Sequence, residues 1–242
     1  MDFLKAQPPS SAGVARRRLV LSTAALLGAG CASRVEVPAP AAAEWRAMQL
    51  PGKRETTYTR CEFQGRAAWH AQSQAAASVW RRRVNVVVTA TTEVEFSWWV
   101  ASTIAGADLS RAEVADSPVR VGFAFDGDVS RLSMRNRMQF QLVETMTGEA
   151  PPFATLMYVW DNHAEIGSVL PGPRSDRLRK IVLERGDDHL RKWRNYRRNL
   201  FNDFQLAFGE PPGPLIGMAL MTDTDNTGGA VEAWYGDVVL KG

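Results

Sequence analysis

The segment 221–229, MTDTDNTGG, holds the densest group of oxygen ligands in the chain. Carboxylate and amide oxygens are the ligands that Ca²⁺ prefers, and the strand predicted after this segment brings a further carboxylate nearby. The candidate calcium ligands are Asp223, Asp225, Asn226 and Asp237. An EF-hand is excluded, because Trp234 occupies the twelfth position from Asp223, where that motif needs a glutamate. In the alternative interpretation, these residues only build the turn between the last two strands.

Aromatic residues beside polar ones form a second candidate site. Sandwich modules hold sugars by stacking a ring on the apolar face of the sugar, while carboxylates and amides bond its hydroxyl groups. Among the eight tryptophans of the chain, the candidate ligand contacts are Trp99 and Trp160, together with Asp161. Trp99 is expected to point away from the apolar strand face that contains Trp98. The alternative is that these rings belong to the core, since aromatic side chains contribute the largest buried areas.

Paired carboxylates are a third candidate, because two of them can share general acid and base work. Asp126 and Asp128 end one predicted strand, and Glu93 and Glu95 share a face of another. A pair of this kind would make the protein a hydrolase acting on envelope polymers. The alternative is that these residues form a turn or a solvated strand face.

The sequence gives little support to other kinds of catalytic site. There is no G-x-S-x-G nucleophile elbow, no cluster of Cys and His at zinc-site spacing, and no glycine loop for phosphate. The histidines number three, His70, His163 and His189. A histidine is more often a packed or surface residue than a catalyst.

Alternating apolar residues predict that β-strands position these side chains. In the segment 93–100, Val94, Phe96, Trp98 and Val100 recur with a period of two, which marks a strand with one buried face. Further strands are predicted at 56–63, 84–89, 119–125, 155–160, 177–184, 215–221 and 231–240.

Two segments have helical spacing of apolar residues, one around 138–146 and one at 200–208 before Gly209. The strands do not alternate regularly with helices, as a parallel α/β sheet would require. The predicted fold is therefore all-β with one or two short helices. We expect a jelly-roll-like antiparallel β-sandwich that forms a single domain over residues 45–242.

The first 31 residues have the order of an export signal. Arg16, Arg17 and Arg18 precede an uncharged apolar run that ends at Cys31, and this run is too short to span a bilayer as a helix. The segment resembles a twin-arginine signal, which carries proteins that fold before export, except that Ala15 replaces the preferred Ser or Thr. The alternative is an ordinary Sec signal.

Cys31 ends a sequence that resembles a bacterial lipobox, LGAGC, in which Gly28 departs from the preferred Leu. Its diacylation would anchor the mature protein, since two acyl chains hold a membrane firmly. The alternative is plain cleavage at an A-x-A pattern near residues 39–41. Residues 32–44, rich in Ala and Pro, are predicted to be a spacer. Ala32 slightly favours the outer membrane by analogy.

The charge balance argues against nucleic acid as a partner. The chain has 29 Lys+Arg and 26 Asp+Glu, and residues 1–31 hold four of the basic residues and one acidic residue, which leaves 25 of each in the mature part. A neutral domain has no global field that attracts nucleic acid or anionic lipid. Contact with a membrane is therefore expected through the lipid anchor only.

Several of these motifs together resemble the DUF3047 family, an uncharacterised bacterial domain. The resemblance covers nearly all of residues 45–242. The matching segments are Leu50-Pro51-Gly52-Lys53, Phe96-Ser97-Trp98-Trp99-Val100, Tyr158-Val159-Trp160, Phe208-Gly209-Glu210, Ile216 to Thr227 and Tyr235-Gly236-Asp237. The resemblance implies an exported protein similar in fold to galactose-binding-like jelly rolls of carbohydrate-binding modules. Some of those modules hold a structural calcium with an aspartate of the last strand, which corresponds to Asp237.

Three functional hypotheses follow. The first is a non-enzymatic module of the cell envelope that binds a carbohydrate or cell-wall glycan, with a structural calcium. The second is the hydrolase that uses paired carboxylates. The third is a structural or assembly partner in the envelope, for which a large exposed apolar patch would be the sign. The sequence identifies no protein partner.

Overall fold

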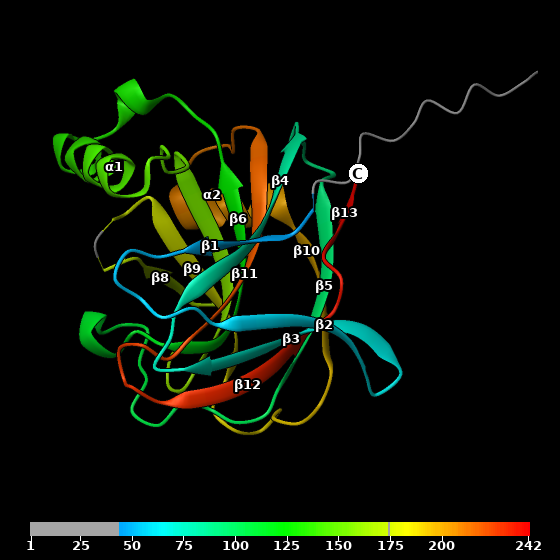
Figure 1. Cartoon of the computed structure of the whole chain (residues 1–242). Coiled ribbons are helices and arrows are strands. Elements are labelled where there is room, and N and C mark those ends of the chain that lie inside the picture. The colour runs from blue at the N-terminus through cyan, green and yellow to red at the C-terminus, as the bar shows by residue number, and fades with distance from the viewer. Residues whose placement is uncertain (1–43, 174) are drawn as a thin grey trace, which may run out of the picture. The chain divides into compact units, whose positions relative to one another are not determined.

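The computed structural model describes residues 44–173 and 175–242, which form two β-sheets packed face to face (Figure 1). The predicted export signal, Cys31 and the spacer lie outside the described residues, apart from Glu44. Within the described ranges, neither α-helix combines the length and the apolar character that a membrane span requires.

One sheet has seven strands, and β6 (Ser117–Phe125), from the middle of the chain, is its central strand. The order across the sheet is β1 (Arg46–Gln49), β4 (Ser78–Val86), β11 (Leu215–Asp223), β6, β7 (Ala154–Asp161), β9 (Leu178–Arg185) and β8 (Val169–Pro171). All neighbours are antiparallel except β7 and β9, which run parallel. The predicted antiparallel sandwich is thus confirmed with one parallel pair that the sequence did not indicate.

The other sheet has six strands and carries the candidate site on its outer face. Its order is β10 (Arg194–Asn199), β5 (Glu93–Val100), β12 (Ala230–Tyr235), β3 (Arg66–Gln74) and β2 (Thr57–Phe63), and β13 (Val239–Lys241) also pairs with β5. The single strand predicted at 231–240 is therefore two strands. The strand is interrupted at Gly236, where a Cβ atom would lie 2.2 Å from the Ser97 hydroxyl oxygen.

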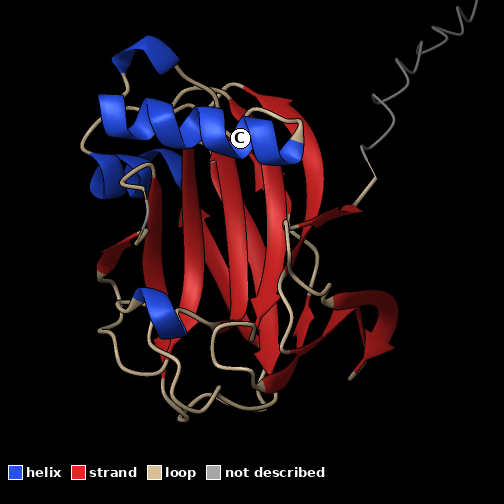
Figure 2. Cartoon of the chain, turned by 60° about the vertical axis from the view of Figure 1, so that its left-hand side comes forward, coloured by secondary structure: helices blue, strands red, loops and turns tan. Residues whose placement is uncertain are grey.

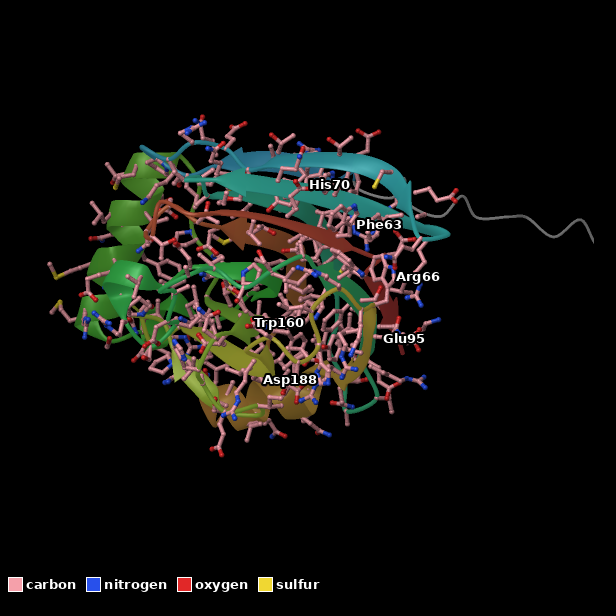
Figure 3. The ribbon with its side chains drawn as sticks, turned by 90° about the horizontal axis from the view of Figure 1, so that it is seen from below. Phe63, Arg66, His70, Glu95, Trp160 and Asp188 are labelled. Carbon is pink, nitrogen blue, oxygen red and sulfur yellow. The ribbon has the colours of Figure 1, made fainter. Side chains whose placement is uncertain are left out.

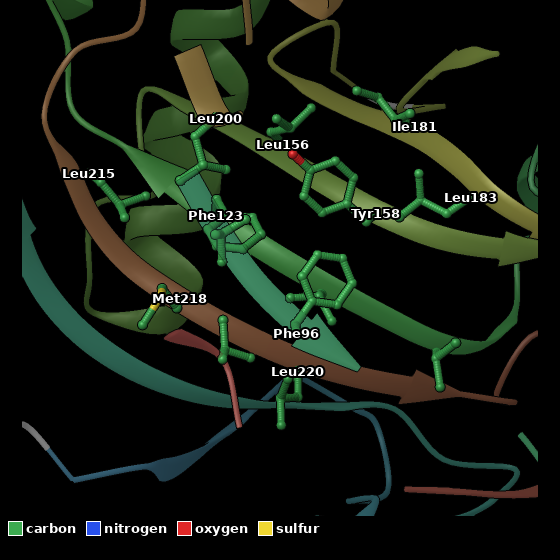
Figure 4. Packing of buried hydrophobic residues seen from close by; sticks show 14 of the residues in the cluster. Phe96, Phe123, Leu156, Tyr158, Ile181, Leu183, Leu200, Leu215, Met218 and Leu220 are labelled. Carbon is green, nitrogen blue, oxygen red and sulfur yellow. The ribbon is translucent and has the colours of Figure 1, made fainter. Parts of the chain in front are cut away.

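The core lies between the two sheets, as the alternation of apolar residues predicts (Figure 4). Phe96 of β5 stacks on Tyr158 of β7 with ring centroids 5.3 Å apart, and Phe123 of β6 meets the same ring edge-on. Such aromatic pairs contribute about 0.5–1.5 kcal/mol beyond the area they bury. Since Phe96 and Tyr158 come from opposite sheets, their contact joins the two layers.

Helix α2 (Leu200–Phe208) closes one end of the sandwich. The Asn199 side chain accepts a hydrogen bond from the Asn202 N–H, and Gly209, with φ of 73°, takes the left-handed conformation that ends the helix. Phe204 packs against Phe125 of the core, with the two ring centroids 4.6 Å apart. The sequence prediction for this helix is confirmed. The helix is amphipathic, and its apolar face points into the core.

Helix α1 (Met134–Thr147) is attached differently. It follows the short 3₁₀ helix η2 (Val129–Arg131) and lies on the outer side of the seven-stranded sheet, across its strands (Figure 2). Asn136 is the one buried residue of this helix, and the positions from 141 to 147 are all exposed. A second 3₁₀ helix, η1 (Ala112–Val114), belongs to the loop over the other end of this sheet.

Candidate functional site

The structure contradicts two of the three predicted sugar contacts. Trp160 is 0% exposed and lies in the core between the sheets (Figure 3), where its indole N–H donates to the Gly186 carbonyl at 3.0 Å. Asp161 is also buried, and its carboxylate accepts N–H groups from Leu109 and from the loop that follows the strand, at 2.6–2.8 Å. Both residues are structural, because no ligand can reach them.

Trp99 lies on the outer face of β5, opposite to Trp98, as the alternation predicts. It is 9% exposed, however, because Phe63 and Trp234 cover it edge-on with ring centroids 5.0 and 4.9 Å away. A sugar needs an open ring face for stacking. Trp99 therefore supports neighbouring rings rather than offering a platform itself.

Phe63, His70, Trp99, Trp193 and Trp234 form an aromatic cluster on this outer face. Trp234 is stacked by both His70 at 4.3 Å and Phe63 at 4.1 Å, with interplanar angles of 5° and 13°. Arg66 lies over the ring of Trp193 at 5.0 Å, where its charge is attracted by the π-system. Figure 3 shows His70, Phe63 and Arg66 following one another along this side of the sheet.

A polar groove of about 550 Å³ begins beside the aromatic cluster. Its lining comes mainly from β2, β3, β12 and the segments next to them. The side chains that can donate or accept hydrogen bonds there are Arg54, Glu55, Thr57, Gln72, Gln74, Ser102 and Glu232. Within the described part of the chain, the amides of Gln72 and Gln74 bond to no other residue, so their donors and acceptors are available to a ligand.

Strand register places these groups side by side. Gln72 of β3 pairs with Thr57 of β2 on one side and with Glu232 of β12 on the other. Residues directly opposite on one face of an antiparallel sheet have Cβ atoms about 4.5–5.5 Å apart. Three polar side chains from three strands therefore form one row across the groove.

Glu232 connects the groove with the aromatic cluster. Its carboxylate lies 2.8 Å from Nε2 of His70, whose ring stacks on Trp234 in the next cross-strand row. Glu232 is exposed, while His70 is half-buried. The pair is a hydrogen-bonding unit at the edge of the groove.

The sequence contains a signal for this groove in the polar residues of β3. In the segment 66–74, RAAWHAQSQ, the polar residues His70, Gln72 and Gln74 recur with a period of two, which places them on one face of a strand. The segment was not predicted as a strand, because it has few β-branched residues.

The structure brings together a different set of carboxylates from the predicted calcium ligands. Asp116, which was not predicted, comes within 4.8 Å of the carboxylate oxygens of Asp223 and Asp225, and these three are the residues that could hold a cation. Asp237 lies elsewhere, exposed and paired with Arg60 at 2.9 Å. Asn226 donates its side-chain N–H to the Ala112 carbonyl at 2.8 Å.

Protein cations already balance this carboxylate cluster. Arg120 donates to Asp223 at 2.7 Å and Lys53 pairs with Asp225, while Asp116 accepts three hydrogen bonds from Asn226 and Thr227. Burial raises the pKa of Asp223 to about 6, although Arg120 opposes the rise. A calcium ion would have to displace Lys53, so we interpret the cluster as a structural ion-pair network.

The same segment also forms a buried hydroxyl network. The Thr222 hydroxyl lies 2.7 Å from the Tyr235 hydroxyl, and the Thr222 carbonyl accepts a hydrogen bond from the Thr56 hydroxyl at 2.8 Å. Ser73 bridges Thr224 and the Ala76 carbonyl, both at 2.9 Å. The segment therefore ties the seven-stranded sheet to β2, β3 and β12 behind the groove.

The carboxylate pairs proposed for a hydrolase have local structural roles. Asp128 caps η2 by accepting the Ser130 N–H, and this hydrogen bonding lowers the pKa of Asp128, whereas a general acid needs a raised pKa. Glu93 and Glu95 both lie within ion-pair distance of Arg197, at 2.7 and 3.5 Å. The hydrolase hypothesis therefore gains no support from these residues.

A second hollow of about 310 Å³ is less suited to ligand binding. It is lined in part by His189, whose Nδ1 lies 2.5 Å from a Glu184 oxygen. Burial raises the pKa of Glu184, but hydrogen bonds from Tyr196, His189 and Arg194 outweigh this effect and leave the pKa lowered. Because Glu184 is buried and already has three donors, it fixes the surrounding loop.

Comparisons with known proteins agree with the sequence resemblance. The model of DUF3047, described as a protein of unknown function, matches residues 43–239. Among curated proteins, none matches the chain.

A comparison with solved structures gives similar proteins that include two carbohydrate-active enzymes by name. The chain is similar to endoglucanase 3 of family GH12 from Trichoderma harzianum, with 10% identity, a TM-score of 0.43, and coverage of 84% of this chain and 99% of that one. It is also similar to a loop-swap mutant of Xyn11A from Necallimastix patriciarum, with 8% identity, a TM-score of 0.33, and coverage of 81% and 99%.

Proposed function

The chain belongs to the DUF3047 family, and we propose that it is a non-enzymatic binding module whose groove on the six-stranded sheet holds a carbohydrate of the cell-wall glycan class. The observation that carries this proposal is the row of polar side chains across an open hollow of about 550 Å³, in which the amides of Gln72 and Gln74 bond to no other described residue. This volume lies within the usual range of ligand sites, but those sites are lined mostly by apolar groups. A polar lining suits a ligand rich in hydroxyl groups.

The aromatic cluster supports the same class of ligand. Its rings border the polar row through His70 and Glu232, so that a sugar in the groove would meet both hydrogen-bonding groups and half-buried ring edges. The Trp234 ring is held in place by its two stacked neighbours. A site fixed before binding avoids part of the entropy cost of ordering side chains.

We expect substitutions in the groove to weaken glycan binding. Gln72→Ala should lower the affinity about five- to tenfold, the value of one neutral hydrogen bond, and Glu232→Ala about ten- to a hundredfold, the value of a bond to a charged group. Binding would be measured on a glycan array and by titration with soluble peptidoglycan fragments. Gln205→Ala, at an exposed position of α2, is the matched control.

Two results would contradict the proposal. Unchanged affinity of Gln72→Ala and Glu232→Ala, with binding still present, would place the ligand elsewhere. Release of sugar products that is lost in Asp126→Asn would favour the hydrolase, whereas a binding module predicts no product and no effect of that substitution.

We further propose that the protein is exported and anchored at the membrane through a lipid on Cys31. The support is the order of charged and apolar residues in the first 31 positions and the lipobox-like LGAGC. Mass spectrometry of the exported protein should find an N-terminal cysteine carrying a diacylglycerol. An unmodified N-terminus beyond Cys31 would exclude the anchor.

A further inference from the structure

Helix α1 presents its apolar side chains to solvent. Met134, Met138, Leu142 and Met146 recur every four residues, which places them on one side of the helix. They are 69%, 64%, 59% and 58% exposed. We call these four residues the α1 stripe. Soluble surfaces carry scattered apolar residues, but a contiguous row marks an interaction site.

The α1 stripe faces away from the domain except at Met146, which borders a hollow of about 350 Å³ beside β1. The inward side of the helix is formed by Asn136, which donates to Asp176 at 2.5 Å, and by the half-buried Phe140. A helix of 14 residues is marginal in water unless tertiary packing supports it. The domain itself buries little of α1. Docking of the α1 stripe on another surface would therefore add packing that stabilises the helix.

The size of the α1 stripe argues against another folded protein, including a second copy of the chain. A helix of this length is about 21 Å long and about 10 Å wide, so its face covers only a few hundred Å². A stable protein interface buries about 800 Å² on each partner. A bilayer requires no complementary partner surface, and weak interfacial binding suffices where a second attachment exists.

The charges of α1 favour an anionic surface. Arg135 and Arg137 lie beside the α1 stripe, and neither forms an ion pair with a carboxylate of the described residues. Glu144 is the one acidic residue of the helix, so the net charge of the helix is +1. Basic side chains next to an apolar helix face are typical of helices that lie in the membrane interface. This local charge differs from the neutral balance of the whole mature part.

We propose that α1 is an interfacial helix that lies on an anionic phospholipid bilayer, with the α1 stripe inserted among the acyl chains and Arg135 and Arg137 at the headgroup phosphates. The occupant of this surface is thus the membrane to which the chain is proposed to be anchored. The helix would give the domain a second attachment and a fixed orientation. This proposal replaces the expectation that the membrane is contacted through the lipid anchor only.

Hydrogen exchange of the full chain, carrying Cys31→Ser to remove the acyl group, tests the proposal. With vesicles of phosphatidylcholine and phosphatidylglycerol, amides of residues 134–147 should exchange at least tenfold more slowly than in buffer. With phosphatidylcholine alone, the slowing should be under threefold. Helix α2, which also exposes a leucine, should be unaffected and serves as the internal reference.

Variants separate the two contributions. Met138→Gln with Leu142→Gln should abolish the protection of α1, and Arg135→Gln with Arg137→Gln should remove the preference for anionic vesicles. Leu206→Gln is the matched control, since Leu206 is 62% exposed on α2. All three variants should keep the glycan affinity of the parent chain, so a failure of this proposal is distinguishable from a failure of the glycan proposal.

Two outcomes would overturn the inference. Exchange of α1 that anionic vesicles do not slow would show that the bilayer is not the occupant. Protection that appears without vesicles and rises with protein concentration would show instead that a second copy of the chain covers the α1 stripe.

Discussion

Replacing Arg120 by methionine is expected to destabilise the folded protein by about 3–5 kcal/mol, the typical result of removing one partner of a buried ion pair. The Asp223 carboxylate accepts hydrogen bonds from Arg120 at 2.7 Å and from the Ser117 N–H at 3.1 Å. The Arg120 and Asp223 side chains are 9% and 5% exposed. Arg120→Met would leave the carboxylate of Asp223 buried without the counter-charge that opposes the rise of its pKa.

Urea denaturation at pH 7 measures this loss. Burial raises the pKa of Asp223 to about 6, so at pH 7 the carboxylate is ionised and the ion pair is present. Asp237→Asn is the control, because its pair with Arg60 is exposed and such pairs contribute about 0–1 kcal/mol. If Arg120 and Lys53 supply the balancing charge, the loss is equal in calcium and in chelator. A loss seen only in chelator would restore a metal to the carboxylate cluster.

Replacing Lys180 by methionine is expected to stabilise the protein at pH 7 by about 1–3 kcal/mol, as replacement of buried charges by apolar groups of similar volume often does. Lys180 is 1% exposed, and its ammonium donates to the Leu109 carbonyl at 3.0 Å. Burial lowers the pKa of Lys180 from 10.5 to about 8, and nearby Arg120 adds to the effect. A lowering of this size corresponds to roughly 3 kcal/mol of cost for the charged form. Methionine has a similar length and no charge to bury.

The pH dependence of this gain gives the sharper test. Below pH 8 the lysine is protonated in both the folded and the unfolded chain, so the cost of the buried charge is fully present. Between pH 8 and 10.5 the unfolded chain binds more protons than the folded one, and the stability of the parent rises with pH. The advantage of Lys180→Met should therefore shrink over this range. Lys192→Met, at an exposed position, should show no such trend.

The strands with an alternating apolar face could be predicted from the sequence, because their pattern records a one-sided core. The segments 93–100 and 119–125 are of this kind, and both are strands, although the face of 119–125 opposite to the core, which carries Arg120, is buried as well. Strands β3 and β10 are absent from the sequence prediction, since RAAWHAQSQ and RNYRRN have low β-propensity. They are strands because their backbones pair with β12 and β5. Because β3 is absent from the sequence prediction, the groove is absent too, since its glutamines lie on β3.

The predicted sugar contacts Trp160 and Asp161 were wrong for a different reason. In β7 the residues of both strand faces are buried, because a loop containing Leu109 packs over Val159 on the outer face while Trp160 faces the core. In a strand buried on both faces, a polar residue beside a tryptophan holds a neighbouring loop by hydrogen bonds and does not mark a surface site. The ligands of the carboxylate cluster were predicted in part, since Asp223 and Asp225 are close in sequence, but Asp116 is remote in the chain and only the fold brings it there.

The late position of two interior strands in the chain has a consequence for biosynthesis. β11 lies between β4 and β6, and β12 lies between β3 and β5, so each sheet is completed by residues after position 214. Loop closure over such distances precedes the gain from pairing and makes folding slow. A nascent chain therefore cannot close either sheet until the residues after position 214 have been synthesised. If the export route accepts only folded cargo, this topology by itself withholds truncated chains from secretion.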